Sequence, residues 1–279
     1  MRIPSFLFRG RTLRFWDYWL LSKFSEKVLN ISRGTRARME KIVVLSYDVE
    51  TWDGECGGEK EPSGNPQEEY FKYLPKLLAV LDRYSAKAQF FVCGKVLERY
   101  SEAFVEVARR GHGIGGHGYY HENMSVLSRD AQKALVSIVK RLMYKKLGVE
   151  MRSWRCPGLV ANIETFKVLG DLGVKYSSNC YRVKPFSIDG VLEIPLSSRM
   201  DYHVLKSQAQ KNTDGKLWIE HVKEKIITNS GLLVFGMHMW IQRKYDPECS
   251  GIASLLDLLR SAGNRVWVGR FDDFEEIIV

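Results

Sequence analysis

The sequence lacks several features that mark common protein classes. No apolar run reaches eighteen residues, so no stretch is expected to span a bilayer as a helix. The five cysteines are odd in number and include no C-x-x-C pair, which argues against a disulfide framework or a thiolate zinc site and favours a reducing compartment. Repeats and low-complexity tracts are also missing. With 45% hydrophobic and 27% charged residues over 279 positions, one large domain, or one domain with a short appendage, is expected.

Outside the N-terminal segment, basic residues only slightly outnumber acidic ones. Residues 1–40 carry nine Lys or Arg against three Asp or Glu, whereas residues 41–279 carry 33 against 30. A nucleic-acid-binding domain would show a basic face on its folded body, so that function is not expected. The sequence therefore predicts two parts, a basic amphipathic segment over residues 1–40 and a domain over residues 41–279.

The N-terminal segment is not typical of a secretory signal, because charges interrupt it and no apolar stretch precedes a small-residue cleavage site. From Leu13 to Ile31 its apolar residues recur every three or four positions, which predicts an amphipathic helix. Two interpretations stay open. The helix either packs on the domain and covers the bottom of a barrel, or contacts a membrane surface peripherally through residues 1–38. A cytoplasmic location is expected in both cases.

The domain alternates short β-branched runs with helical patterns, which predicts a parallel sheet. About eight strands in about 240 residues favour an α/β fold of the distorted (β/α) barrel type, with seven to eight strands. In such barrels the chemistry takes place where strands end and loops begin. The expected strands are Ile42–Tyr47, Ala88–Cys93, Gly113–Gly116, Met151–Arg155, Val174–Ser177, Val191–Pro195, Leu232–Met237 and Arg265–Val268. The expected helices are Tyr70–Tyr84, Val96–Arg110, Arg129–Leu147, Ile163–Leu172 and Gly251–Ala262.

Titratable residues follow two of these strands early in the chain. Asp48 and Glu50 end the first strand two positions apart, so on an extended chain both face the same side. His117 and His121 follow a glycine-rich strand end, and if this segment is helical both rings lie on one face and can bind one metal ion. Two histidines and one carboxylate leave open positions on a divalent ion, as a catalytic site requires.

Arg155 and His238 end two further strands. An arginine beside buried carboxylates would keep them ionised and oriented, and Pro157-Gly158 would bend the chain and free the N–H of Gly158. A histidine at the end of an apolar strand is either a core histidine or a proton donor in a cleft. Each motif also has a plainer interpretation, as loop acids, surface histidines or a surface arginine. Because all four motifs are expected at the same edge of the sheet, a single functional site is favoured over four unrelated features.

In this order the motifs resemble the motif series of the NodB-type polysaccharide deacetylases, carbohydrate esterase family 4. The resemblance covers residues 41–279, and the pattern Gly-His-x-Ile-Gly-x-His-Gly at residues 111–118 is its most specific part. It implies a distorted (β/α) barrel and one divalent metal, usually zinc. The implied reaction is hydrolysis of an acetyl or formyl group from the nitrogen of an amino sugar, in a polysaccharide or in a lipid- or nucleotide-linked glycan precursor.

The resemblance also implies catalytic roles. Asp48 matches the base, Arg155 matches the arginine that orients it, and His238 matches the general acid. The backbone N–H near Gly158 would help to stabilise an oxyanion.

Three further residues match the metal ligands of the family, Glu50, His117 and His121. Glu50 stands in for the usual adjacent aspartate, because Val49 at that position cannot bind metal.

One motif of the family is degenerate. The acid that would tune His238 is expected near Ser177 but is absent, and Asp272 or Asp273 is the speculative replacement. The carbohydrate itself would lie in a cleft formed by the loop Gly54–Pro66 and by aromatic faces, which suit sugar rings. The candidate aromatics are Trp52, Tyr119, Tyr120, Trp154 and Trp240.

Two other functions stay open. Val49 and Ser177 depart from the family pattern, so the chain could be a catalytically impaired barrel that binds sugar without releasing acetate. A related amidohydrolase acting on small cyclic amides is the second alternative, and small-molecule amides as substrates would favour it.

Overall fold

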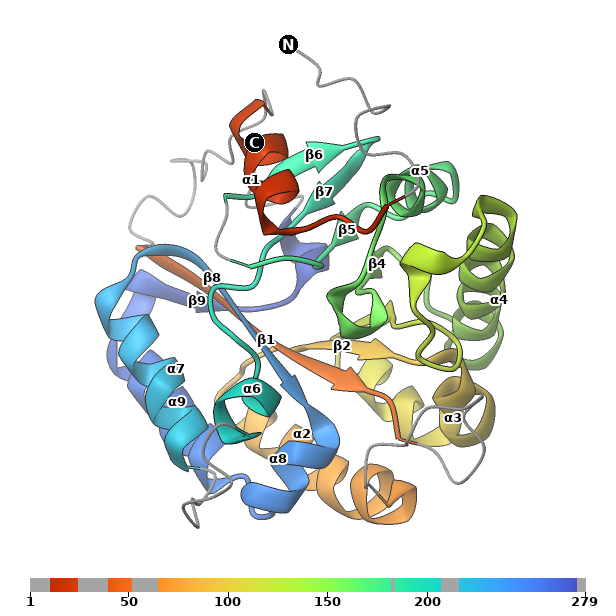
Figure 1. Cartoon of the computed structure of the whole chain (residues 1–279). Coiled ribbons are helices and arrows are strands. Elements are labelled where there is room, and N and C mark those ends of the chain that lie inside the picture. The colour runs from red at the N-terminus through yellow and green to blue at the C-terminus, as the bar shows by residue number, and fades with distance from the viewer. Residues whose placement is uncertain (1–10, 25–39, 52–64, 182–183, 207–215, 275–279) are drawn as a thin grey trace.

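The computed structural model describes residues 11–24, 40–51, 65–181, 184–206 and 216–274. A strongly curled sheet lies at the centre and helices cover its outside (Figure 1). The strands are β1 (Lys41–Val49), β2 (Gln89–Val92), β3 (Gly113–Gly116), β4 (Ser153–Trp154), β5 (Tyr176–Ser177), β6 (Phe186–Ile188), β7 (Val191–Glu193), β8 (Gly231–His238) and β9 (Val266–Val268). The α-helices are α1 (Phe15–Phe24), α2 (Leu74–Arg83), α3 (Gly94–Arg109), α4 (Arg129–Leu147), α5 (Ile163–Asp171), α6 (Asp201–Lys206), α7 (Lys216–Thr228), α8 (Met239–Tyr245) and α9 (Ser250–Ser261). A π-helical stretch, Gln67–Tyr73, leads into α2, and short 3₁₀ turns cover Met124–Val126, Pro157–Leu159, Gly263–Arg265 and Phe271–Asp273.

The sheet curls into a distorted barrel. Its strands follow the order β6-β7-β5-β4-β3-β2-β1-β8, with β9 beside the start of β1, and all pairs are parallel except β6 with β7. After β7 the chain reaches the opposite edge of the sheet. There the N–H of Ser197 donates to the carbonyl of Val234 at 2.8 Å, and the Ser197 hydroxyl accepts from the N–H of Val234 at 2.9 Å. These two bonds bring the edges together and confirm the predicted barrel.

The alternation of residues along β1 explains why its polar side chains lie at the mouth of the barrel. Successive side chains of a strand point to opposite faces. Val43, Leu45, Tyr47 and Val49 belong to the core between the sheet and the helices, whereas Ile42 and Val44 belong to the core inside the barrel. The inward row continues with Ser46, Asp48 and Glu50, so the acids arrive at the mouth of the barrel on the side that faces its interior.

All eight expected strands are present, and α4 has the predicted bounds, ending at Gly148 in the left-handed conformation (φ +67°). The short strand β6 was not expected. It forms a hairpin with β7 through Asp189 and Gly190, both with positive φ, a two-residue turn that matches the twist of the paired strands. Helices α6, α7 and α8 were also not predicted.

The N-terminal segment packs on the body over its described part. Leu13 and Tyr18 are buried, and the Tyr18 ring lies 6.4 Å from that of Phe166 and 6.3 Å from that of Phe186. The N–H of Leu13 donates to the carbonyl of Ala161 at 2.9 Å. Ala161 lies in the loop that follows β4, so the expectation that the segment covers the bottom of the barrel is wrong. It packs at the edge where the parallel strands end.

The rest of the expected N-terminal helix, residues 25–31, lies outside the described residues. The division of the chain at residue 40 and the cytoplasmic location stay predictions. Among the described helices, none combines the length and the apolar character needed to cross a bilayer.

Candidate active site

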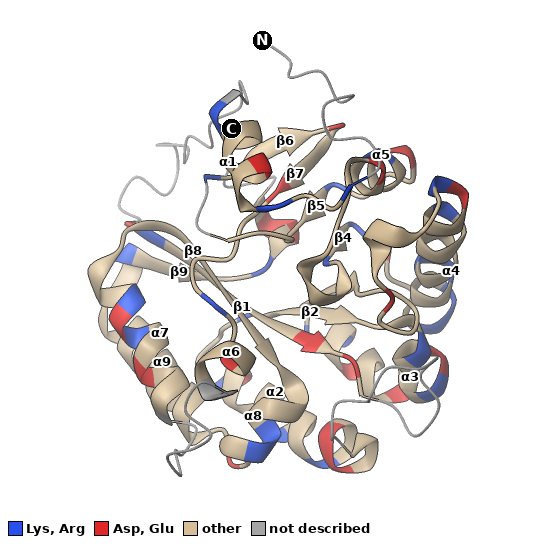
Figure 2. Cartoon of the chain, viewed as in Figure 1, with Lys and Arg blue, Asp and Glu red and all other residues tan. Residues whose placement is uncertain are grey.

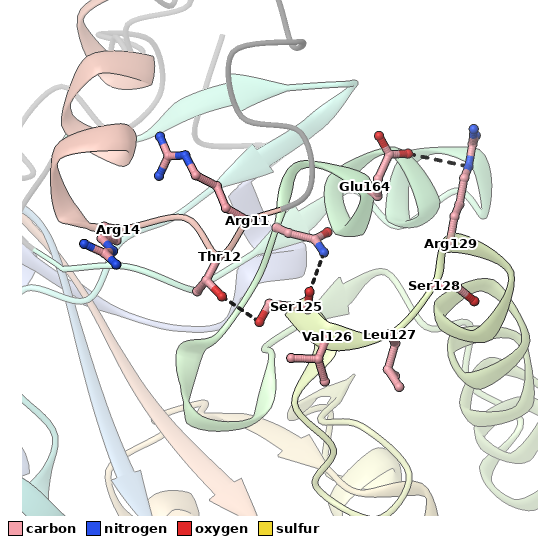
Figure 3. A pocket seen from close by; sticks show the side chains of 10 residues that line it. Arg11, Thr12, Arg14, Ser125, Val126, Leu127, Ser128, Arg129 and Glu164 are labelled. Atoms are coloured by element: carbon pink, nitrogen blue, oxygen red, sulfur yellow. Dashed lines mark hydrogen bonds and ion pairs between the residues drawn. The ribbon is translucent and has the colours of Figure 1, made fainter.

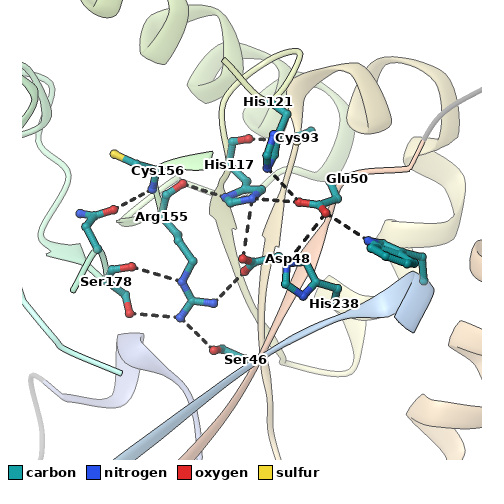
Figure 4. A network of polar contacts seen from close by, with 12 residues as sticks. Ser46, Asp48, Glu50, Cys93, His117, His121, Arg155, Cys156, Ser178 and His238 are labelled. Carbon is teal, nitrogen blue, oxygen red and sulfur yellow. Dashed lines mark hydrogen bonds and ion pairs between the residues drawn. The ribbon is translucent and has the colours of Figure 1, made fainter. Parts of the chain in front are cut away.

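The polar ends of β1, β3, β4 and β8 meet at the mouth of the barrel (Figure 4). Figure 2 shows acidic residues at the tip of β1, surrounded by strands that carry little charge. Asp48 and Glu50 come from β1, His117 and Arg155 directly follow β3 and β4, and His238 ends β8. His121 reaches the same point from the loop after β3, so the structure brings together all the residues that the sequence predicts for the catalytic and metal-binding roles.

Glu50, His117 and His121 form a compact cluster of three donor groups, whose donor atoms all lie within 4.8 Å of one another. The Oε2 atom of Glu50 is 3.3 Å from Nε2 of His117 and 3.1 Å from Nε2 of His121. Two donors bound at about 2.0 Å to one tetrahedral ion lie roughly 3.3 Å apart. The spacing of the cluster therefore suits a single small divalent cation.

The histidine pair does not lie on a helix, so helical spacing, the condition under which the sequence placed both rings on one face, is not what brings them together. His117 and His121 belong to an irregular loop in which Gly118 (φ +71°) and His121 itself (φ +67°) adopt the left-handed conformation. A bond from the N–H of Tyr119 to the Glu122 carboxylate at 2.8 Å holds this tight loop. The two rings meet with centroids 5.2 Å apart because the loop folds back, not because of helical periodicity.

The tautomer of His117 shows which kind of ligand would suit the space between its ring and the carboxylates of Asp48 and Glu50. Its Nδ1 is 2.9 Å from the carbonyl oxygen of Arg155, which can only accept a hydrogen bond, so Nδ1 carries the proton. In the neutral ring Nε2 then presents a lone pair toward the carboxylates of Glu50 (3.3 Å) and Asp48 (3.7 Å). Lone pairs facing each other repel unless a cation lies between them. This hydrogen bond is the one that commonly orients a metal-binding histidine, and the residues fit a divalent metal.

Electrostatics point the same way. Burial would raise the pKa of Glu50, but the positive charges of His238 and His121 outweigh it and hold this pKa well below its usual value. Burial lowers the pKa of His121, yet the hydrogen bond and charge of Glu50 raise it overall. The site is thus a place where a buried carboxylate stays ionised and attracts positive charge.

Asp48 is held apart from this cluster by Arg155. The guanidinium Nη1 donates to Oδ1 of Asp48 at 2.7 Å, and both side chains are buried. Arg155 also donates from Nη2 to the hydroxyls of Ser46 (2.9 Å) and Ser178 (3.1 Å) and from Nε to the carbonyl of Ser178 (3.2 Å). Its guanidinium lies 4.3 Å from the ring centroid of Phe91. Oδ1 of Asp48 is therefore engaged, whereas Oδ2 faces the cluster.

His238 has a carboxylate partner that the sequence reading missed. Its Nδ1 lies 2.7 Å from Oδ1 of Asp201, and its backbone N–H donates to Oδ2 of the same residue at 2.9 Å. Asp201 is fully buried, and Gln242 donates to it at 2.8 Å. The proposal of Asp272 or Asp273 as this partner is wrong. Asp273 instead accepts from Arg270.

The environment of His238 favours its protonated form. Burial lowers the pKa of this imidazole, but the charges of Asp201 and Glu50 raise it more, to about 10. Because Nδ1 donates to Asp201, Nε2 carries the second proton of the imidazolium, and it lies 3.9 Å from Oε1 of Glu50. The side chain is 15% exposed, so a ligand in the mouth can reach it.

A different carboxylate occupies the region where the family pattern has its degenerate motif. Glu193 of β7 is fully buried and accepts from the Ser177 hydroxyl at 2.5 Å and from the backbone N–H and side-chain amide of Asn179. The amide oxygen of Asn179 in turn accepts from the N–H of Cys156. Glu193 thus joins the loops after β4 and β5, and does not bond to His238 in the described structure.

Two side chains fix the position of Glu50. The indole N–H of Trp240 donates to its Oε1 at 3.1 Å. The hydroxyl of Tyr70, in the π-helical stretch, accepts from the N–H of Thr51 at 3.1 Å and donates to the carbonyl of the same residue. Since Thr51 directly follows Glu50, this clamp holds the chain where β1 ends.

The remaining predicted residues have different positions. Gly158 is exposed beside Pro157, with φ +59°, in the loop that carries Arg155. Tyr119 packs its ring on Gly94 of α3 and hydrogen-bonds Glu98, so its role as a substrate contact stays a prediction. Trp154 is fully buried in the core and cannot line a cleft. Trp52 and the loop 54–64 lie outside the described residues.

Residues 37–177 match the family model for polysaccharide deacetylase. A curated relative, the peptidoglycan deacetylase of Helicobacter pylori, is 28% identical over 110 residues, which is 37% of this chain and 38% of the relative. A second, the peptidoglycan-N-acetylglucosamine deacetylase of Bacillus cereus, is 27% identical over 86 residues, 31% of each chain. The chain thus spans only about a third of the length of these relatives.

Solved structures share the fold at low identity. A Mycobacterium smegmatis protein described as a polysaccharide deacetylase superposes with a TM-score of 0.70 at 19% identity, covering 91% of this chain and 94% of that one. A Bacillus anthracis pseudoenzyme of carbohydrate esterase family 4 superposes with a TM-score of 0.59 at 17% identity, covering 85% and 66%. At this identity the likeness supports the fold, and activity has to be argued from the site.

The cluster predicts how the chain binds metal. His117→Ala removes a buried donor, so we expect zinc affinity to fall by about a hundredfold or more, since even partners of metal ligands contribute ten- to a hundredfold. His221→Ala, on α7 and stacked on Trp218, is the matched control and should leave zinc affinity unchanged. Competition with a chromophoric chelator measures both. Equal zinc affinity in wild type and His117→Ala would contradict the ligand assignment.

Proposed function

This chain belongs to the polysaccharide deacetylase family, and we propose that it is a metal-dependent hydrolase that removes an N-acetyl or N-formyl group from an amino sugar. The sugar is part of a polysaccharide or of a lipid- or nucleotide-linked glycan precursor. The observation that carries this proposal is the separation of two acids from one strand. Glu50 faces the histidine pair, while Asp48 beside it is engaged by Arg155 through one oxygen only.

The mechanism assigns a separate task to each group. Glu50, His117 and His121 would hold a divalent ion, which would supply polarisation of the amide carbonyl and activation of the attacking water. Asp48, held by Arg155 through Oδ1, accepts the proton of the attacking water through its other oxygen, Oδ2. As the C–N bond breaks, His238 delivers the proton of its Nε2 to the leaving amine. Water is consumed, and the products are a free amino sugar and acetate or formate.

The positions around the substrate follow from the same geometry. Gly158 lies in the loop after Arg155, where its backbone N–H can stabilise the oxyanion of the tetrahedral intermediate. Trp240 has its indole nitrogen on Glu50 and is only half-buried, so its ring is the proposed contact for a sugar. Val49, the residue that departs from the family pattern, packs in the core between the sheet and the helices. Glu50, directly after β1, faces the barrel interior and takes the metal-binding role that the family gives to an aspartate at the position of Val49.

We expect Asp48→Asn to retain metal and to lose about two to four orders of magnitude in kcat, the usual contribution of a general base. The assay is release of acetate and formate from a panel of N-acetylated and N-formylated amino sugars and their oligomers, with metal content determined on the same samples. An unchanged rate would remove Asp48 from the role of base.

The same panel tests the function as a whole. His221→Ala should behave as wild type, which excludes a general effect of substitution. Wild-type protein that holds metal and binds a sugar of the panel but releases neither acid would contradict the proposal and favour a binding-only barrel. Cleavage of small cyclic amides in place of sugar amides would favour the related amidohydrolase.

The His238–Asp201 pair predicts a change in pH dependence. The general acid must be protonated, so activity falls as pH rises through the pKa of His238. Asp201 raises that pKa by its charge and hydrogen bond, so Asp201→Asn should move the alkaline limb of the kcat profile to lower pH. The acidic limb should move little. A uniform loss of rate with an unmoved alkaline limb would show that Asp201 does not tune this histidine.

A further inference from the structure

Helix α1 is attached to the body by one face only. Leu13 (5% exposed) and Tyr18 (3% exposed) enter the core, and the buried Asp17 accepts from the N–H of Arg14 at 2.8 Å and from the Arg11 guanidinium. These contacts fix the rotation of the helix about its axis. The residues on the opposite face are therefore held toward the solvent by the fold.

The opposite face is apolar and aromatic. Phe15, Trp16 and Trp19 are 46%, 71% and 41% exposed. Their rings contact one another edge to face, with centroids 5.4 Å apart for Phe15 and Trp16 and 6.0 Å apart for Trp16 and Trp19. A helix that is apolar on both sides is normally buried on both sides. Something other than the described part of this chain is thus expected to cover this face.

The surroundings of the aromatic face are basic. Arg11, Arg14 and Lys23 are exposed around it, and the Lys23 ammonium lies 5.5 Å from the centroid of the Trp19 ring. The acid on this helix, Asp17, is turned inward. Tryptophans flanked by Lys and Arg suit the interface of an anionic bilayer, where the rings lie at the level of the headgroups and the cations meet lipid phosphates.

The segment that carries the aromatic face is bonded to the loops of the candidate active site just before α1 begins. The hydroxyl of Thr12 donates to that of Ser125 at 2.8 Å, in the loop after β3 that carries His121 (Figure 3). Leu13 bonds to Ala161 in the loop after β4 that carries Arg155. Between these loops and the segment lies a cavity of about 960 Å³ whose lining includes Arg11, Arg14 and Arg129. A surface that covered α1 would therefore meet the molecule at its catalytic edge.

We propose that the outer face of α1, formed by Phe15, Trp16 and Trp19 with Arg14 and Lys23, binds the surface of an anionic lipid bilayer. The rings insert at the headgroup level and the two cations contact lipid phosphates. This contact holds the loops after β3 and β4 next to the membrane. The inference does not depend on the proposed reaction, because it uses no residue of the metal cluster or of the catalytic pairs.

The test is flotation of the full chain with phosphatidylcholine vesicles that contain phosphatidylglycerol, at low salt. Wild type should float, and the double variant Trp16→Ala/Trp19→Ala should lose about tenfold or more in partition coefficient, because two interfacial aromatics are removed. Tyr144→Ala is the matched control, since Tyr144 is 69% exposed on α4, and it should float as wild type does. Thermal unfolding of the double variant should match wild type, because neither ring is buried.

A second test concerns the contribution of positive charge to membrane binding. Arg14→Glu/Lys23→Glu should weaken flotation, and added salt or vesicles of phosphatidylcholine alone should weaken that of wild type. The proposal is overturned if wild type stays unbound or if Tyr144→Ala loses as much as the tryptophan variant. It is also overturned if the tryptophan variant floats like wild type, which would assign binding to charge elsewhere. Failure of wild type to float, together with a dimer that Trp16→Ala/Trp19→Ala dissociates, would assign the face to a second copy of this chain.

Discussion

The buried ion pair between Arg155 and Asp48 is the interaction on which the site depends. A guanidinium with no exposure to water is tolerable only when its donors are used, and here they bond to Asp48, Ser46 and Ser178. These partners belong to the end of β1 and to the loop after β5, while the arginine itself follows β4. One side chain therefore ties three parts of the barrel mouth together. Removing one member of such a buried pair typically lowers the free energy of unfolding by about 3–5 kcal/mol. The contact that positions Asp48 therefore also stabilises the fold.

The same logic explains how three neighbouring acids keep different properties. Asp48 is paired with Arg155, Asp201 with His238, and Glu50 with the two histidines of the β3 loop. Each carboxylate is paired with a different basic partner, and among the described residues Glu50 and its two histidines form the cluster whose spacing suits a metal ion. Charge compensation thus separates the proposed base, the partner of the proposed acid and the proposed metal ligand, although all three lie at one mouth.

Local patterns in the sequence predict the parts of this arrangement that depend on single elements. The alternation of β1 predicts that Asp48 and Glu50 share a face, and the parallel strands predict that Arg155 and His238 reach the same edge. The approach of His121 depends on two left-handed residues in one loop, which helical spacing does not describe. Asp201 pairs with His238 only because Ser197 and Val234 bring distant segments together. It is nevertheless the only acid between residues 194 and 213, a signal that was available. The Asp189-Gly190 pair was likewise a local signal for the β6–β7 hairpin.

The central claim is that Asp48 stands beside the metal site without being a ligand. Anomalous diffraction at the zinc edge, from crystals of the full chain grown with zinc, tests it directly. The account predicts one peak about 2.0–2.2 Å from Nε2 of His117, Nε2 of His121 and a carboxylate oxygen of Glu50, with Oδ1 of Asp48 still bonded to Arg155. A peak away from this cluster, or one bound by Asp48 with Glu50 turned away, would contradict it.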